Sequence, residues 1–428
     1  MANLNNKNNF FTFFCLYIAQ QIPMSFFATI IPIIMRQEKF SLSTIGFIVA
    51  FIKIPWILKF LWSPVVDRFN VSVKDYKRWI ILSEFVFAAF IFAVAFFDLL
   101  TSFYVILTLL ILSFFASATQ DIATDGLATQ SFDRKNKSMI NSMISMGRFG
   151  GALLGGGVLL WFYQKIGWSN INFFLAGLVI VALLPLYFNQ GLTINREKSV
   201  TKQVILADIF WFFFQRNSIW KKIKFTLFPH LFIVLPHRRK EIGKQVGFLV
   251  LYYISMIGSI AMISPYLVDL GYDMKQISMM RGFLGPAAGV VASFTGGLIV
   301  RKIGRHRSRL LFAVFMLIAA CYLFLISRIA HPDVQLLYVG IFLLWGSYGM
   351  ATVYVYTSAM DHARKGREGT DFTIQTVTAQ LSGICIVTLS GKIAHSFGYN
   401  TLFLFEFVLA CLALTYILLA FRKKTEND

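Results

Sequence analysis

Two aspartates four residues apart are the acidic residues whose spacing in this sequence most suggests chemistry. Asp121 and Asp125 stand in "ATQDIATDGLATQ", at the end of a long apolar run. Residues at positions i and i+4 share one face of a helix, so the two carboxyl groups point the same way. Two interpretations stay open. The acids pair with cations of the Arg68–Lys74 segment or with Arg148, or one of them, with Asp121 the deeper and better candidate, carries a proton.

Basic residues inside apolar runs are the second chemical signal. Lys53 lies in "FIKIPWILKF", Arg148 in "SMGRFGG" and Arg281 in "SMMRGFLG". In hydrocarbon such a charge costs about 2.5–3.5 kcal/mol unless it faces protein or water. Cations that line one cavity would attract an anionic, carboxylate-bearing solute, whereas cations paired with acids between helices would only hold the fold together. Both interpretations stay open, and all three residues are candidates for binding.

The elements that position these residues follow from the composition. The chain has 428 residues, of which 57% are hydrophobic and 14% charged, with 46 phenylalanines. This is too apolar for a soluble globular protein. Continuous apolar stretches of about 20 residues, the length that crosses hydrocarbon as a helix, recur along the chain, and their continuity argues against a β-barrel. We predict an all-α membrane protein that crosses the membrane many times, without a cleaved signal peptide.

Charged and turn-rich segments divide the chain into twelve candidate transmembrane helices. These are residues 10–35, 44–64, 79–97, 103–122, 138–163, 171–188, 246–268, 276–300, 309–327, 336–360, 370–395 and 401–421. The largest interruption separates them into six and six. We therefore predict a six-helix bundle over residues 1–188, a basic amphipathic linker on the cytoplasmic membrane surface over 189–245, and a second six-helix bundle over 246–428.

Lysines and arginines are unevenly distributed between the two sides that these spans define. If both termini are cytoplasmic, most of the 40 basic residues lie inside, and the outer loops carry only Arg36, Lys39, Lys165, Lys275 and Arg328. This asymmetry predicts a multi-pass protein of the cytoplasmic (inner) membrane with both termini inside. It also accounts for the net charge of +20, because the cations face anionic membrane lipids and no nucleic acid is needed as a partner.

Residue patterns for cofactor, metal or covalent chemistry are missing from this sequence. The four cysteines lie inside apolar runs without ligand spacing, and the six histidines are scattered. No GxxxxGK[ST] loop for a nucleotide is present. We therefore predict no metal, no cofactor and no enzyme activity, so that any transport is passive or driven by an ion gradient.

The two predicted bundles echo each other. The second candidate helix is followed by "SPVVDRF" and the eighth by "GGLIVRKIGRHRSR". Parallel six-helix repeats describe the major facilitator architecture. The segment that contains Asp67 and Arg68 resembles the cytoplasmic loop motif of that superfamily, which makes both residues candidates for a gate together with Asp121 and Asp125. In the second copy Arg301 stands where the family usually has an acid.

Longer segments give a more specific resemblance. The stretches "KFLWSPVVDRF" and "ATQDIATDG" resemble the AmpG-like permease group, which holds muropeptide permeases, acetyl-CoA transporters and RhtX/FptX-type siderophore importers. The stretches "QQIPMSFFATIIPIIMRQ" and "GRFGGALLGGGVLLWFYQKIGW" resemble it too and lean towards the siderophore branch. The likeness covers most of the first half and thins after about residue 200. It implies the major facilitator fold and a transport function.

The resemblance also suggests where a solute would bind. In the major facilitator arrangement the second, fifth, eighth and eleventh helices help to line a central cavity, and Lys53, Arg148 and Arg281 fall on three of them. Further cavity candidates on the first, seventh and tenth helices are Gln20, Gln21, Tyr252, Tyr253, Trp345 and Tyr348. Such aromatic residues can equally serve packing. Because Pro23 follows the two glutamines, we predict a break in the first helix near mid-membrane.

Glycines recur at four-residue spacing on two candidate helices. Gly147, Gly151 and Gly155 lie on the fifth, and Gly285 and Gly289 on the eighth. Small residues at this spacing let helices approach closely. We predict that these two faces meet across the two bundles and slide during transport, with plain packing as the alternative.

Together these features predict a monomeric secondary transporter that imports a bulky anionic solute by alternating access, with protons as the coupling ion. A muropeptide and a ferric siderophore are the two solutes considered. The alternatives are a membrane sensor or scaffold that transports nothing, and a flippase or exporter of a lipid or CoA-type solute with the same fold. Cations that face a central cavity would argue against the sensor.

Overall fold

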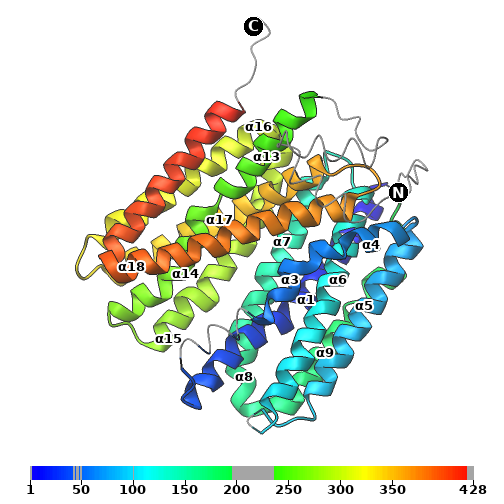
Figure 1. Ribbon diagram of the computed structural model, residues 1–428, viewed down its shortest axis with the longest axis horizontal. Helices are drawn as coiled ribbons and strands as arrows, with labels where there is room; N and C mark the ends of the chain where they lie inside the picture. Colours follow the sequence, from blue (N-terminus) through cyan, green and yellow to red (C-terminus); the bar gives the residue numbers. More distant parts are fainter. Residues whose placement is uncertain are drawn as a thin grey trace, which may run out of the picture.

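The computed structural model describes residues 2–41, 44, 48, 51–99, 101–194 and 236–421. Within these ranges the regular structure is helical and contains no strand, which confirms the predicted all-α class. Long helices lie side by side along one common direction (Figure 1). Most of the predicted linker, residues 195–235, lies outside the described residues.

The helices before residue 195 account for the first part of the chain. They are α1 (Ala2–Gln37), α3 (Ile54–Leu58), the 3-10 helix η1 (Lys59–Leu61), α4 (Ser63–Phe69), α5 (Val73–Val94), α6 (Phe103–Ser131), α7 (Lys137–Leu153), the π-helix η2 (Leu154–Val158), α8 (Leu159–Ile166), α9 (Trp168–Val181) and α10 (Leu184–Phe188). The capping box of Ser72 and Asp75 starts α5, because each side chain satisfies the other's backbone amide.

The helices after residue 235 form the second part. They are α13 (Pro236–Leu251), α14 (Ile254–Asp269), α15 (Met274–Ile277), the π-helix η4 (Ser278–Leu284), α16 (Gly285–Ser327), α17 (Val334–His362) and α18 (Glu368–Ala420). Helix α13 begins ten residues before the predicted seventh span at 246. The first residues of α13 are charged, so the apolar run by which the span was predicted starts later than the helix.

Two of these helices reverse direction at a glycine. Gly304 in α16 has φ 83° and Gly398 in α18 has φ 78°, a left-handed region that L side chains avoid. A straight helix of 53 residues, the length of α18, would extend about 80 Å, far beyond the roughly 30 Å of hydrocarbon. The orange and red portions of α18 instead run in opposite directions (Figure 1).

Eight helical stretches of the described chain are long and apolar enough to cross a membrane. Two of them, Lys275–Ser327 and Glu368–Ala420, contain the glycine reversals. The predicted second span, residues 44–64, consists of short helical pieces and falls partly outside the described residues. The described helices therefore establish a polytopic helical protein, and the count of twelve spans stays a prediction.

Helix α6 continues to Ser131, well past the predicted end at residue 122. Asp121 and Asp125 consequently lie inside a helix, and both are fully buried. Their predicted position at the inner boundary of a span stays a prediction. The polar residues that lower the hydropathy of this stretch are covered by protein rather than by headgroups.

Helix α1 is continuous through Pro23 and Pro32. The predicted break after Gln20 and Gln21 is therefore wrong. A proline costs one intrahelical hydrogen bond and crowds the preceding turn, but neighbouring helices can support a membrane helix across it. Buried contacts of Ile22, Phe26 and Phe27 hold α1 on both sides of Pro23.

Buried apolar side chains form three clusters. One lies wholly within the second part of the chain, from Phe248 to Ile417, and one wholly within the first, from Ile22 to Val179. The third combines Tyr17 and Ile122 of the first part with Met360 of the second. The two parts of the chain thus share a core at one end of the assembly.

That shared end is also where charged connections meet. Two hydrogen bonds join these connections. Asp67, before the α4–α5 connection, accepts from Thr370 after the α17–α18 connection. Arg305, at the Gly304 reversal, donates to the Arg134 carbonyl in the α6–α7 connection. Because these connections carry many lysines and arginines, we call this the basic end.

The glycine faces pack differently from the prediction. Gly147, Gly151 and Gly155 face the backbone of α1, not the second part of the chain. Gly289 faces the Phe149 ring on α7, so the α16 face does meet α7 across the two parts. The prediction that both glycine faces meet each other is therefore wrong for α7, whose close approach serves packing within the first part.

The tightest of these glycine contacts gives a stability test. A Cβ at Gly155 would overlap the Ile22 carbonyl oxygen, a backbone atom that cannot move aside cheaply. We expect Gly155→Ala to lower the free energy of unfolding by about 1–3 kcal/mol through overpacking. Thermal unfolding of the purified protein in detergent measures the change.

Gly177→Ala is the matched control, because a Cβ at this helical glycine meets nothing within 4 Å. It should leave stability unchanged or raise it by up to about 1 kcal/mol. Equal unfolding midpoints for both variants would contradict the packing that we describe for α1 and η2.

Candidate functional site

A buried ion cluster lies between α6, η1 and α7. The Lys59 ammonium is 2.5 Å from Oδ2 of Asp121, and Nη2 of Arg148 is 3.4 Å from Oδ1. Lys59 is 1% exposed and Asp121 fully covered. Charges taken out of water persist only when they are paired, and removing one partner leaves the other uncompensated. Asp121 therefore joins three helical elements through charge.

Asp125 lies one helical turn further along the same face of α6. The Tyr17 hydroxyl of α1 donates a hydrogen bond to Oδ1 of Asp125. The second oxygen, Oδ2, is buried and has no hydrogen-bond partner among the described residues. The two acids thus differ: Asp121 balances two cations, whereas one oxygen of Asp125 is unsatisfied.

Arg148 links this cluster to the second part of the chain. Its guanidinium lies 4.7 Å from the ring centroid of Tyr17 on α1 and 4.7 Å from that of Tyr356 on α17. Planar guanidinium groups favour such stacking on aromatic faces. Arg148 therefore contacts α1 and α17 at once, and these contacts depend on the relative position of the two helices.

The pairing partners of the acids were predicted only in part. The ion pair of Arg148 with Asp121 is among those expected from sequence. Arg68 is exposed, and no described residue of the Arg68–Lys74 segment forms an ion pair with either acid. Sequence reasoning missed Lys59, although it stands in the same apolar run as Lys53. Six residues correspond to about 240° around a helix, which places the two lysines on different faces.

Lys53 and Arg281, two of the predicted cavity cations, come from opposite parts of the chain. Lys53 precedes α3, and Arg281 belongs to η4. The second π-helix, η2, adjoins η4, where a Cβ at Gly157 would lie 3.4 Å from the Gly282 carbonyl oxygen. Within the described chain neither Lys53 nor Arg281 forms an ion pair with an acid, and both side chains are exposed. Each part of the chain therefore contributes one cation that no described carboxylate neutralises.

Three of the predicted aromatic residues form a wall at the junction of the two parts. The Phe149 ring of α7 lies 6.1 Å from Trp345 and 6.0 Å from Tyr348, both on α17. Tyr253 in turn packs edge-on against Tyr348 at 5.6 Å. Phe149 was not among the predicted residues; its place directly after Arg148 is the only signal that could have suggested it.

The other predicted cavity residues are engaged in packing. The Tyr252 hydroxyl donates to the Arg309 carbonyl at 2.9 Å, and its ring packs on Phe248. Gln20 donates to Gln120 at 2.7 Å between α1 and α6, and Gln21 donates to Ser25 along α1. These contacts engage the Tyr252 hydroxyl and the amide nitrogens of Gln20 and Gln21 within the protein.

Asp67 joins the two parts at the basic end. Its carboxylate accepts hydrogen bonds from the backbone amides of Gly369 at 3.1 Å and Thr370 at 2.6 Å. These amides open α18, and free N–H groups at a helix start favour an anion. Burial raises the pKa of Asp67 to about 7, while hydrogen bonding from the side chain and the backbone amide of Thr370 opposes that shift. A gating role for Asp67 and Arg68 stays a prediction.

Long apolar helices around a buried ion cluster define a polytopic helical membrane protein. The chain belongs to the Major Facilitator Superfamily, whose family model matches residues 10–388. This membership confirms the resemblance drawn from the loop motif. Within it the chain is a multi-pass membrane transporter.

Individual relatives show which members of the superfamily this chain resembles. The anhydromuropeptide permease of Escherichia coli (strain K12) is 23% identical over 407 residues, which cover 94% of this chain and 77% of that protein. A Rickettsia conorii protein that carries the transporter name AmpG 4 is 23% identical over 416 residues, 94% of each chain. These matches confirm the predicted resemblance to the AmpG-like permeases.

Solved structures agree on the fold. Two crystal structures of a bacterial homologue of the iron transporter ferroportin, in the outward-facing state with and without soaked iron, give TM-scores of 0.63 and 0.64. They cover 98% and 97% of this chain and 99% of their own, at 15% identity. At that identity the likeness concerns the fold alone.

The ion cluster can be tested as an energetic unit. Lys59→Gln and Asp121→Asn should each lower the free energy of unfolding by about 3–5 kcal/mol, because each leaves a buried charge unpaired. In the double variant no such charge remains between them, so the loss should be clearly smaller than the sum. Unfolding of the four purified proteins in detergent gives the coupling energy.

Arg68→Gln serves as the control, since this exposed cation takes part in no described ion pair. It should change stability by less than about 0.5 kcal/mol. Strictly additive losses for Lys59→Gln and Asp121→Asn would show that the two residues do not stabilise each other.

Proposed function

We propose that this protein imports a bulky anionic solute across the inner membrane, together with protons, by alternating access. The observation that carries the proposal is the pair Lys53 and Arg281. Each part of the chain contributes one of these cations, both side chains are exposed, and neither forms an ion pair with an acid of the described chain. Cations from both parts that no carboxylate neutralises favour an anionic solute.

The solute that fits this arrangement best is a muropeptide. Such a sugar–peptide carries carboxylates for Lys53 and Arg281 and an apolar sugar face for the aromatic wall of Phe149, Trp345 and Tyr348. The name of the Escherichia coli relative points to the same class of solute. A ferric siderophore is the second candidate, supported by the resemblance of the first-helix segment. Family membership disfavours a sensor or scaffold. An exporter or a flippase with the same fold is the alternative to import.

We further propose the full major facilitator architecture for this monomeric transporter. The reversals at Gly304 and Gly398 and the short pieces before α4 add up to twelve passes in two six-helix bundles, 1–188 and 246–428. The basic end then faces the cytoplasm, as the distribution of lysine and arginine requires. The contacts of Asp67 with α18 would close that side while the opposite side admits the solute.

For proton coupling we propose Asp125 rather than Asp121. Protonating Asp121 would leave the Lys59 ammonium without its partner at 2.5 Å. Asp125 has no cation within ion-pair distance among the described residues, and its unsatisfied Oδ2 could hold a proton. Tyr17 donates a hydrogen bond to Asp125 and stacks on Arg148, which also stacks on Tyr356 of α17. Protonation of Asp125 would therefore alter contacts that connect α6 with α17.

Solute uptake by proteoliposomes with an imposed pH gradient tests the binding residues. The Lys53→Gln/Arg281→Gln variant should take up labelled anhydro-muropeptide at least about tenfold more slowly, because charge-assisted hydrogen bonds worth about 1.5–3 kcal/mol each are lost. Lys165→Gln, which removes an exposed cation from the end of α8, should transport normally. Undiminished uptake by the double variant would exclude this site, and faster uptake of a ferric siderophore by the wild type would reassign the solute.

A separate measurement tests proton coupling. Asp125→Asn should still exchange labelled for unlabelled solute across the membrane, yet lose accumulation driven by the pH gradient, because its side chain is fixed in the neutral form. Comparing exchange with accumulation in the same vesicles separates the two. Accumulation at the wild-type level would rule out Asp125 as the proton carrier.

A further inference from the structure

A cavity of about 600 Å³ opens at the basic end, between α13, α16, α17 and the α6–α7 connection. We call it the basic cavity. It is lined by five cations and two acids: Arg134, Lys137, Lys244, Arg305, Arg309, Glu241 and Asp361. Five formal positive charges against two negative leave an excess of three. Such an excess in one concave site attracts anions.

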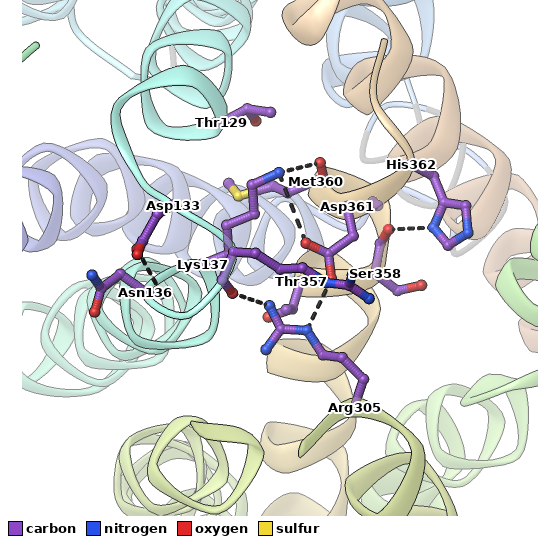
Figure 2. Close-up of polar contacts among 12 residues, drawn as sticks. Thr129, Asp133, Asn136, Lys137, Arg305, Thr357, Ser358, Met360, Asp361 and His362 are labelled. Carbon is purple, nitrogen blue, oxygen red and sulfur yellow. Dashed lines mark hydrogen bonds and ion pairs between the residues drawn. The ribbon is translucent and has the colours of Figure 1, made fainter. Parts of the chain in front are cut away.

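One acid of the basic cavity is already shared between two cations (Figure 2). Asp361 receives a hydrogen bond from Nε of Arg305 at 2.9 Å and lies 3.8 Å from the Lys137 ammonium. Lys137 also donates to the Met360 carbonyl at 2.7 Å, and Arg305 to the Arg134 carbonyl at 2.5 Å. These bonds fix the positions of Lys137 and Arg305, so the floor of the cavity is preorganised.

Arg309 supplies a donor that none of the described residues accepts. Its guanidinium lies 3.8 Å over the Phe421 ring, and Nη2 approaches His306 at 3.3 Å. The Nε–H group of Arg309 is buried and has no hydrogen-bond partner among the described residues. A buried donor without a partner costs free energy, which a bound acceptor would recover.

We propose that the basic cavity binds a phosphate-bearing anion through Arg309, Lys244 and the cations around Asp361. Phosphate oxygens point in several directions and accept from arginine and lysine donors that converge from different helices. The shared chemistry is that of an acidic phospholipid headgroup or of a free phosphate compound. Basic pockets between membrane helices on the cytoplasmic side suit such headgroups.

The site is distinct from the one in the proposed function. Arg281 and Arg305 are separated by roughly 35 Å along the axis of η4 and α16, at 1.5 Å per residue. Arg134 and Lys137 come from the first part of the chain, and Lys244, Arg305 and Arg309 from the second. An anion held from both sides would stabilise the arrangement in which the two parts meet at the basic end, in proportion to its preference for that arrangement.

The test uses the full-length protein in phosphatidylcholine nanodiscs. One arm adds phosphatidylglycerol to the nanodiscs and the other adds inorganic phosphate to the solution, and each follows the thermal unfolding midpoint through a titration. We expect a saturable rise of the midpoint. A rise with phosphatidylglycerol alone identifies a headgroup site, and a rise with inorganic phosphate as well identifies a site for free phosphate compounds.

Matched variants decide whether the basic cavity is responsible. Arg309→Gln/Lys244→Gln should weaken the apparent affinity about tenfold or more. Arg301→Gln/Lys302→Gln removes the same charge from exposed positions of α16 outside the cavity and should stay within about twofold of the wild type. Equal loss in both variants, or no rise of the midpoint with either probe, would overturn the proposal.

Folding defects are separated from binding by the midpoint in pure phosphatidylcholine, where the variants should match the wild type. If the unfolding midpoint of Arg309→Gln/Lys244→Gln in pure phosphatidylcholine is below that of the wild type, the single variant Lys244→Gln decides the test. Lys244 is exposed and contributes little to packing. An unchanged affinity of that single variant would then refute the site.

Discussion

The need to balance the Asp121 charge away from water is the constraint on which the rest of the structure depends. Asp121 has no exposed surface, and its partners Lys59 and Arg148 come from separate helical elements. In a low-dielectric interior an unpaired carboxylate costs several kcal/mol of stability. The elements η1, α6 and α7 must therefore pack together to bury Asp121. Arg148 then extends the same constraint to α17 through the Tyr356 ring.

A second pair of carboxylates joins the two parts of the chain at the basic end. Asp67 of the first part accepts backbone amides of α18, and Asp361 of the second part accepts Arg305 while lying beside Lys137 of the first. Both junctions add hydrogen bonds and charge pairs to the apolar core that the two parts share at this end. Polar contacts of this kind can be exchanged for water at modest cost, which fits the alternating access that we propose.

The sequence predicted the class and most helices, because hydropathy over about 20 residues directly reflects the thickness of hydrocarbon. It failed where polarity was satisfied inside the protein. The end of α6 was placed too early because Asp121 and Asp125 resemble a boundary when their partners are unknown. Pro23 suggested a break for a similar reason, since the contacts of Phe26 and Phe27 that support α1 come from distant segments.

The sequence by itself therefore determined the membrane environment and the superfamily, because these follow from local composition and from motifs such as that of Asp67. Only the tertiary structure decided the partners of the buried acids: Lys59 and Arg148 for Asp121, and Tyr17 for Asp125. The physical reason is that a buried charge specifies that it needs a partner, whereas the identity of that partner depends on which helices pack together.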